Sequence, residues 1–124
     1  MEQPTIEKKI TKEEWAKMDY EQKKGWIEES IALNDENTTK FSLSMADAVR
    51  KSFNYPEEVS FGIDGIPRAK NGTVTLADEG IVFYKGFCTA KNAFGVKSQY
   101  SYAIRTIVTP FETTIDEVTV TEIK

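Results

Sequence analysis

Histidine is absent from this chain of 124 residues, and cysteine occurs once, as Cys88. Without imidazole the chain lacks the commonest general base, the commonest metal ligand, and the Ser–His and Cys–His nucleophile pairs. A structural zinc site needs Cys and His ligands that this composition does not supply. A single cysteine allows no internal disulfide, so cysteine usage does not indicate a compartment. These absences predict a protein that is not an enzyme and that holds no metal or cofactor.

A basic surplus and a long apolar run are also missing. The 16 basic and 20 acidic residues give a net charge of −4, which is not the electrostatic footprint of a nucleic-acid binder. No apolar stretch approaches the roughly 20 residues that cross a membrane. The first ten residues lack the basic and then apolar layout of a signal peptide. We therefore expect no nucleic-acid partner and no membrane span. The location is expected to be cytoplasmic as the sequence is written, and the cell envelope or the outside if a leader was removed.

The residues that are present are those of an ordinary folded domain. Hydrophobic residues make up 40% and charged residues 29% of the chain, which argues against wholesale disorder. Residues 1–10 are polar and contain a proline, so they are predicted to form a flexible arm. Residues 11–124 are predicted to form a single domain. It combines a helical segment at 11–33 with a helix-plus-sheet core at 44–124.

Helix start signals divide the N-terminal segment. A capping box at residues 11–14 predicts the start of one helix, and a second N-cap signal at 19–22 predicts another, which ends near Leu33. Gly25 lies in the middle of the second helix and costs roughly 1 kcal/mol against alanine there. The polar residues 34–39 predict a connector to the rest of the chain.

Apolar spacing then indicates a third helix, followed by strands. Met45, Val49 and Phe53 share one helical face after a start near Ser44. The later chain alternates with a period of two and contains turn dipeptides, including an Asn-Gly that predicts a type I′ turn. The strands are expected at 57–61, 73–76, on both sides of a turn at 90–95, and at Ile115–Ile123. Short turns between them favour a meander. The predicted fold class is α+β, with N-terminal helices followed by an antiparallel meander sheet and a helix packed on one of its faces.

The long hairpin Gly80–Val108 is the most informative part of this pattern. Its first strand carries apolar residues on both faces, which predicts a central strand covered at least partly on both sides. Its second strand alternates, with Tyr100, Tyr102 and Ile104 facing one way. Cys88 lies among apolar neighbours and is interpreted as an inert core residue.

One family resemblance rests on three segments in order. They are the short helix Ala46-Asp47-Ala48-Val49-Arg50-Lys51, the segment Tyr55–Phe61, and the turn Ala-Lys-Asn-Ala-Phe-Gly that ends at Gly95. This order resembles a family of small bacterial and phage-associated domains of unknown function, often found in lipoproteins or exported proteins. The resemblance covers about residues 44–108. It implies a helix on an antiparallel sheet and no known activity. The chain departs from the family by lacking a visible export signal and by adding the helical segment 11–33.

The hairpin turn has two interpretations. In the structural one, Asn92 and Gly95 supply positive φ angles and Phe94 folds back as a plug. In the functional one, Lys91, Asn92 and Phe94 grip a protein partner or an anion. Every residue of the turn has a local backbone reason to be there, which favours the structural interpretation.

The N-terminal helices offer the most balanced pair of interpretations. Trp15, Met18 and Trp26 could form a docking face for another protein, or they could pack inward against the sheet together with Ile27 and Ile31. The inward packing is the commoner use of such a stripe.

The function predicted from sequence is a non-catalytic protein-interaction or accessory module, bacterial or phage in origin, with a protein partner. An edge strand such as Ile115–Ile123 could instead pair with its own copy and give a homodimer. The alternative is a small-ligand-binding protein, or a carboxylate-dependent hydrolase, with a cleft between helix and sheet. The acidic pairs at 78–79 and 116–117 are interpreted as solvated turn and edge charges, because adjacent carboxylates on a strand point to opposite faces.

Overall fold

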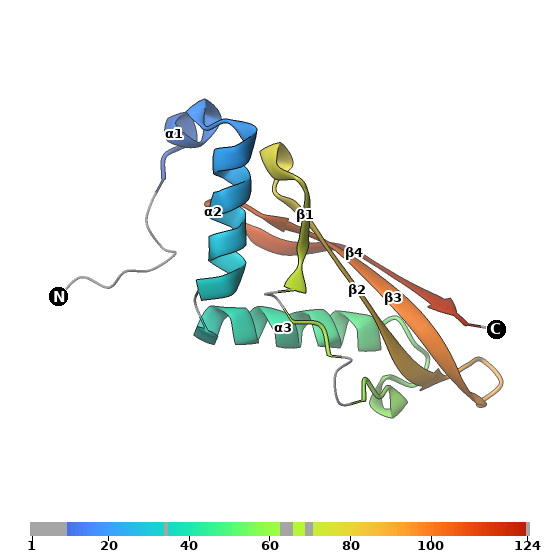
Figure 1. The fold of residues 1–124 in the computed structure, drawn as a ribbon. Helices are drawn as coiled ribbons and strands as arrows, with labels where there is room; N and C mark the ends of the chain where they lie inside the picture. The colour runs from blue at the N-terminus through green and yellow to red at the C-terminus, as the bar shows by residue number, and fades with distance from the viewer. Residues whose placement is uncertain (1–9, 34, 63–65, 69–70, 124) are drawn as a thin grey trace.

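The structure, a computed structural model, describes residues 10–33, 35–62, 66–68 and 71–123. Its four strands form one antiparallel sheet in the order β1-β2-β3-β4, with the helices N-terminal to it (Figure 1). The predicted α+β class and the meander are confirmed. The elements are α1 (Lys12–Lys17), α2 (Tyr20–Leu33), α3 (Asp35–Arg50), η1 (Pro56–Glu58), β1 (Thr73–Leu76), η3 (Ala77–Glu79), β2 (Ile81–Lys91), β3 (Lys97–Val108) and β4 (Thr113–Glu122). Residues 1–9 of the predicted arm lie outside the described residues, and Ile10 packs against the core.

The first two helices begin where their caps predict. The Thr11 hydroxyl accepts a hydrogen bond from the Glu14 N–H at 3.1 Å, and the Glu14 carboxylate accepts one from the Thr11 N–H at 2.9 Å. Asp19 and Gln22 repeat this exchange at 2.8 and 2.9 Å. Each pair satisfies backbone donors that a helix start leaves unpaired. The second cap follows directly on the end of α1, which explains the break between the two helices.

The third helix begins earlier than predicted. The connector expected at 34–39 is wrong, because α3 starts at Asp35 and not near Ser44. The apolar spacing of Met45 and Val49 continues backwards to Phe41, whose ring centroid lies 6.2 Å from that of Tyr84. Burying this longer stripe against the sheet outweighs the weak helix propensity of the polar residues before it.

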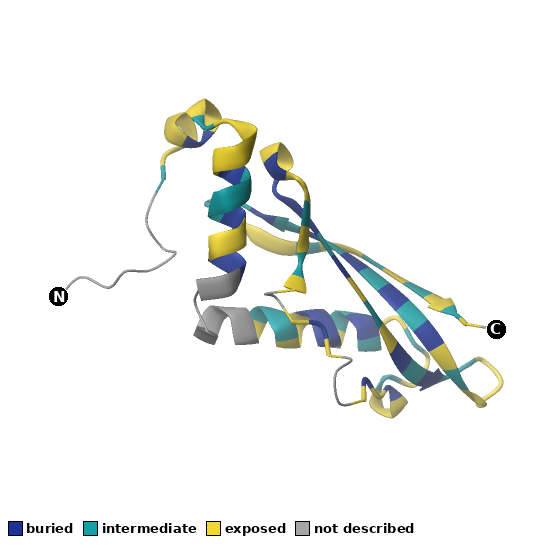
Figure 2. Ribbon diagram, in the orientation of Figure 1, coloured by how far each residue is buried: buried dark blue, intermediate teal, exposed yellow. Residues whose placement is uncertain are grey.

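One face of the sheet forms most of the core. Met45 and Val49 of α3 are fully buried, and the ring of Phe53 stands edge-on to Tyr100 with 4.8 Å between centroids. The predicted packing of this helix on the sheet is therefore confirmed. Figure 2 shows buried residues alternating with intermediate ones along much of β2 and β3. The buried side of these two strands consists of Val82, Tyr84, Cys88, Ala90, Tyr100, Tyr102, Ile104, Thr106 and Val108.

The opposite face of the sheet is less covered than the sequence predicted. On β2, which does lie between two neighbours, Phe83 is half-buried, while Lys85 and Phe87 are exposed. The side chain of Phe87 keeps 58% of its surface in solvent. On this second face only the start of the strand is covered, where Ile81 is 2% exposed and Phe83 is half-buried. The strand belongs to a sheet that has its helices on one side.

Two local predictions between residues 57 and 72 are wrong. Residues 57–61 do not form a strand, because Pro56 opens the 3₁₀ turn η1 and only Ser60 bridges to Thr89 of β2. Proline fits the first position of such a turn, where its missing N–H costs nothing. Gly72 lacks the positive φ of a type I′ turn. A Cβ at this position would lie 2.5 Å from Cγ1 of Val82. The glycine allows the backbone at position 72 to lie close to β2.

The buried tyrosines predict a loss of stability in alkali. Burial raises the pKa of Tyr102 from 10.0 to about 12, and burial also raises the pKa of Tyr84. Their neutral forms therefore stabilise the fold fully below about pH 10, and this contribution is lost as the pH rises through 12. Denaturant titrations at several pH values should show stability falling above about pH 10. The fall should be shallower in Tyr102→Phe. Stability unchanged up to pH 12 would contradict the burial of these phenols.

Candidate functional site

The six residues that the sequence singled out lie in two groups at opposite ends of the molecule (Figure 1). One group belongs to α1, α2 and the link between them, and the other to the hairpin turn between β2 and β3. No single surface therefore combines them. The groups are Trp15, Met18 and Trp26 at one end, and Lys91, Asn92 and Phe94 at the other.

At the hairpin turn, two of the three residues have structural partners. Oδ1 of Asn92 accepts hydrogen bonds from the N–H groups of Phe94 and Val96, at 2.9 and 3.1 Å. Nζ of Lys91 lies 3.3 Å from a carboxylate oxygen of Glu58 and 5.8 Å from the ring centre of Tyr55. The expectation of a positive φ holds for Gly95, at 77°, and is wrong for Asn92. Asn92 shapes the turn with its side chain.

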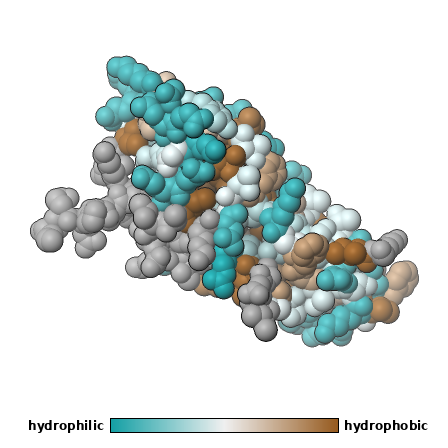
Figure 3. Space-filling view, in the orientation of Figure 1, coloured by the Kyte–Doolittle hydropathy of each residue, from teal (hydrophilic) through white to brown (hydrophobic). Residues whose placement is uncertain are grey.

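Phe94 does not fold back as the predicted plug. Its side chain keeps 89% of its surface exposed, and the neighbouring Val96 keeps 57%. In the space-filling view, apolar side chains reach the surface at the end of the molecule that the hairpin forms (Figure 3). A turn whose backbone is satisfied by Asn92 has no need of an aromatic plug.

At the other end, Trp15 serves packing. It is 8% exposed, and its ring stands edge-on to that of Trp26, with 5.6 Å between centroids. Nζ of Lys23 lies 5.6 Å from the Trp15 ring centre and 3.0 Å from Oδ1 of Asp78 in η3. Together with the buried Ile27, these contacts hold α1 to α2 and α2 to η3. The inward interpretation of the aromatic stripe therefore applies to Trp15.

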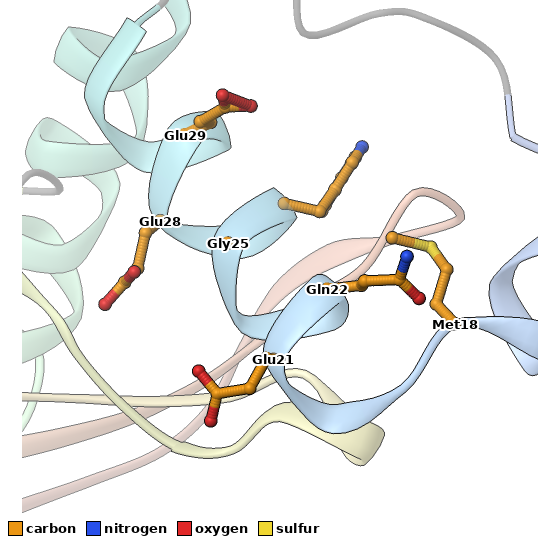
Figure 4. Close-up of a pocket in the computed structure, with 7 residues that line it drawn as sticks. Met18, Glu21, Gln22, Gly25, Glu28 and Glu29 are labelled. Carbon is orange, nitrogen blue, oxygen red and sulfur yellow. The ribbon is translucent and has the colours of Figure 1, made fainter.

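The outward side of α2 carries a groove of about 640 Å³. Lys23, Ile27 and Ile31 point into the protein from one side of the helix. At 100° per residue, the opposite side of α2 carries Glu21, Gln22, Gly25 and Glu29. Glu28 and Trp26 flank this side, and Met18 contributes from the link before α2. Figure 4 shows this stretch of α2, with Gly25 between Gln22 and Glu29. The lining consists of Met18, Glu21, Gln22, Gly25, Trp26, Glu28 and Glu29.

The groove combines an apolar part with acidic rims. Met18 and Trp26 are half-buried and supply apolar surface. Three carboxylates and no basic side chain belong to the lining. In Figure 4, Glu21 and Glu28 extend on one side of α2, and Glu29 extends on the other. A partner in this groove would therefore meet negative charge on both sides of Gly25 and apolar surface where Met18 and Trp26 lie.

Among the residues that the structure describes, no contact requires glycine at position 25. Its φ is not positive, and a Cβ built on it meets nothing within 4 Å. Glycine in a helix interior nevertheless costs roughly 1 kcal/mol against alanine. A residue that lowers helix stability without improving the packing indicates a functional constraint at that position. An open glycine in the middle of a groove allows another chain to approach the helix closely.

Replacing Gly25 with alanine should therefore stabilise the protein. The variant is expected to gain about 1 kcal/mol in free energy of unfolding and to melt roughly 4 °C higher. Thermal and denaturant unfolding followed by circular dichroism would measure both changes. Glu29→Ala, on the same side of α2, serves as the control and should change stability by less than about 0.5 kcal/mol. Reduced stability of Gly25→Ala would show that the fold itself needs this glycine.

The cleft expected between helix and sheet is filled where α3 crosses the strands. Met45 and Val49 leave no exposed surface there. A different cavity of about 310 Å³ lies beside Phe61, Tyr84 and Tyr102, and its described lining includes the cations of Arg68 and Lys85 and no carboxylate. The alternative of a ligand-binding protein or hydrolase stays a prediction. Within the ranges that the structure describes, no cluster of three or more His, Cys, Asp or Glu side chains is suited to hold a metal ion.

Cys88 occupies the core, as predicted. It is 3% exposed, and burial raises the pKa of its thiol. Both features lower the reactivity of a cysteine, because the thiolate is the nucleophile. The thiol therefore acts as a small apolar side chain.

Comparison with known proteins adds no family. No protein-family model matches the chain, and no curated protein or solved structure matches it. The resemblance of residues 44–108 to small bacterial and phage-associated domains stays a prediction. Among the described helices, none has both the length and the apolarity to cross a membrane.

Sequence reasoning named Met18 and Trp26 but missed the other groove residues. Glu21, Glu28 and Glu29 look like ordinary solvated charges on an amphipathic helix. The available signal was Gly25, which stands where alanine would be better and on the side opposite Ile27. A helical projection of residues 20–29 would have placed Glu21, Gly25 and Glu29 together on that side.

Proposed function

We propose that this chain is a non-catalytic protein-interaction module of a bacterial or phage protein set, and that the groove on α2 is its docking surface. The observation that carries the proposal is Gly25. It weakens α2, a Cβ on it would meet no atom of the described residues within 4 Å, and it lies in the middle of the groove of about 640 Å³. A docked partner supplies the missing reason for a glycine at this position.

The groove belongs to a platform that is fixed before any partner arrives. Reciprocal caps define the starts of both helices, and the ion pair between Lys23 and Asp78 ties α2 to η3. The edge-on contact between Trp15 and Trp26 fixes one flank of the groove. A preformed surface loses little conformational entropy on binding, which favours recognition of a separate chain.

The other proposed mode, a homodimer through the edge strand β4, has weaker support. β4 does lie at an edge of the sheet, but its register shifts opposite Arg105 and Thr106. Asp116, at this irregularity, pairs with Arg105 at 3.5 Å. Bulges and charges are features that protect an edge strand from pairing.

Site-specific photo-crosslinking in an extract of the cells that encode the chain tests the proposal. A photoreactive residue at Glu29 is expected to give one adduct of defined mass. The same residue at the exposed Glu57 of η1, far from the groove, should not give it. Gly25→Leu should remove the adduct at position 29, because leucine fills the groove. No adduct at position 29, or equal adducts at 29 and 57, would contradict docking in the groove.

A further inference from the structure

We infer that the partner docks as an amphipathic α-helix whose apolar stripe is flanked by lysine or arginine side chains. The inference rests on the proposed function and adds the chemistry of the partner. It follows from three properties of the groove: its direction along α2, the open surface at its centre, and the sign of its charge.

The groove follows the axis of α2. Its lining recurs every three or four residues from Met18 to Glu29. Within α2 the lining runs from Glu21 to Glu29, which makes a strip of about two turns, roughly 12 Å long at 1.5 Å per residue. Met18 adds to one end of this strip from the link before the helix. The apolar stripe of a second helix has the same period and can follow this strip with anchors one turn apart.

The centre of the strip is the place where a second helix can come closest. Gly25 contributes no side chain, and the space above it is open. Helix axes pack 8–10 Å apart depending on the side chains at the contact, so glycine favours the short end of this range. An extended peptide would gain less binding energy from this surface than a helix. The backbone of α2 is hydrogen-bonded within its own helix and cannot pair with the unpaired N–H and C=O groups of a strand.

The charge of the strip selects a basic helix. Glu21 and Glu28 on one side and Glu29 on the other face any bound helix with carboxylates. Lysine or arginine beside an apolar stripe would pair with them across the rim. The net charge of −4 favours the same partner at long range. A second copy of this groove is disfavoured, because two equivalent faces would bring their carboxylates together.

Titration with synthetic helices tests the inference. The probe is a peptide of 18 residues with leucines at helical spacing, flanked by lysines in an alanine background. The comparison peptide carries glutamate at every lysine position. ¹H–¹⁵N correlation spectra of the full chain should show shifts confined to residues 18–29 with the lysine peptide. Its affinity should be at least tenfold higher than that of the glutamate peptide and should fall as salt is added.

Two triple variants separate the groove from overall charge. The first variant should lower the affinity for the lysine peptide at least tenfold; it combines Glu21→Gln, Glu28→Gln and Glu29→Gln. Glu57→Gln, Glu79→Gln and Glu112→Gln together change the net charge by the same amount at exposed positions outside the groove. They should leave affinity within about twofold. Equal losses in the two variants would overturn the inference, because overall charge would then explain the binding.

The remaining outcomes separate this inference from the proposed function. Equal affinity for the two peptides at residues 18–29 would overturn the charge of the partner and leave the docking surface in place. Shifts outside residues 18–29, or no binding of the lysine peptide up to about 1 mM, would overturn the basic helix as the occupant. Crosslinking at Glu29 then decides separately whether the groove binds a partner of other chemistry.

Discussion

Replacing Gly80 with alanine is expected to lower the free energy of unfolding by about 3 kcal/mol or more. Gly80 ends η3 in the left-handed region, with φ at 72°. A Cβ at this position would lie 2.5 Å from the backbone oxygen of Val108. That oxygen belongs to the end of β3, and Val108 also donates its N–H to the carbonyl of Gly80 at 2.8 Å. The added methyl group therefore forces β2 and β3 apart at the end of the hairpin.

Gly95→Ala is the matched control for this substitution. Gly95 has nearly the same φ, 77°, but a Cβ there meets nothing within 4 Å. Gly95→Ala should lower the free energy of unfolding by only about 1–2 kcal/mol, the cost of a side chain in the left-handed region. Chemical denaturation of both variants measures the difference. Equal losses would contradict the close approach of Gly80 to β3.

Met45→Ala should be the second severe change, with a loss of roughly 2–5 kcal/mol. The Met45 side chain is fully buried between α3 and the sheet, so its removal leaves a cavity. Leu43, two residues earlier on the same helix, keeps 56% of its surface exposed. Leu43→Ala should cost less than about 1 kcal/mol.

Urea titrations of these two variants test where α3 packs. A larger loss for Leu43→Ala would mean that α3 presents another side to the sheet. Similar losses for both would mean that α3 is buried all round. Either result would contradict the assignment of one face of the sheet to the core.

The fold class could be predicted from sequence because several local signals agree. The capping boxes, the helical spacing of Met45 and Val49, and the alternation in β3 each indicate one element. The start of α3 could not be predicted. Its first residues have weak helix propensity, and the packing of Phe41 against Tyr84 is a tertiary contact that a local pattern does not contain. The expected strand at 57–61 failed for a similar reason, since alternation over five residues did not outweigh the turn that Pro56 starts.

The candidate site was only partly predictable. The sequence indicated an aromatic face on the first two helices but did not separate Trp15, which packs inward, from Met18 and Trp26, which line the groove. That separation depends on the angle between α1 and α2, which only the folded chain shows. The hairpin looked like a place for a function, and its turn instead satisfies its own backbone through Asn92.

The core and the candidate docking surface draw on different parts of the molecule. The inner sides of β2, β3 and α3 supply most of the core together with Trp15, Ile27 and Ile31, and the outer side of α2 carries the groove. Domain organisation as one unit at 11–124 stays a prediction. The docking function depends most directly on a single residue, Gly25.

Gly25→Leu therefore gives the most direct test, with stability and partner capture measured on the same preparation. Leucine is a better helix former than glycine, so the free energy of unfolding should stay equal or rise by up to about 1 kcal/mol. The adduct at Glu29 should disappear at the same time. Loss of capture in a protein of full stability is the predicted result. An adduct at Glu29 that persists in Gly25→Leu would contradict docking in the groove.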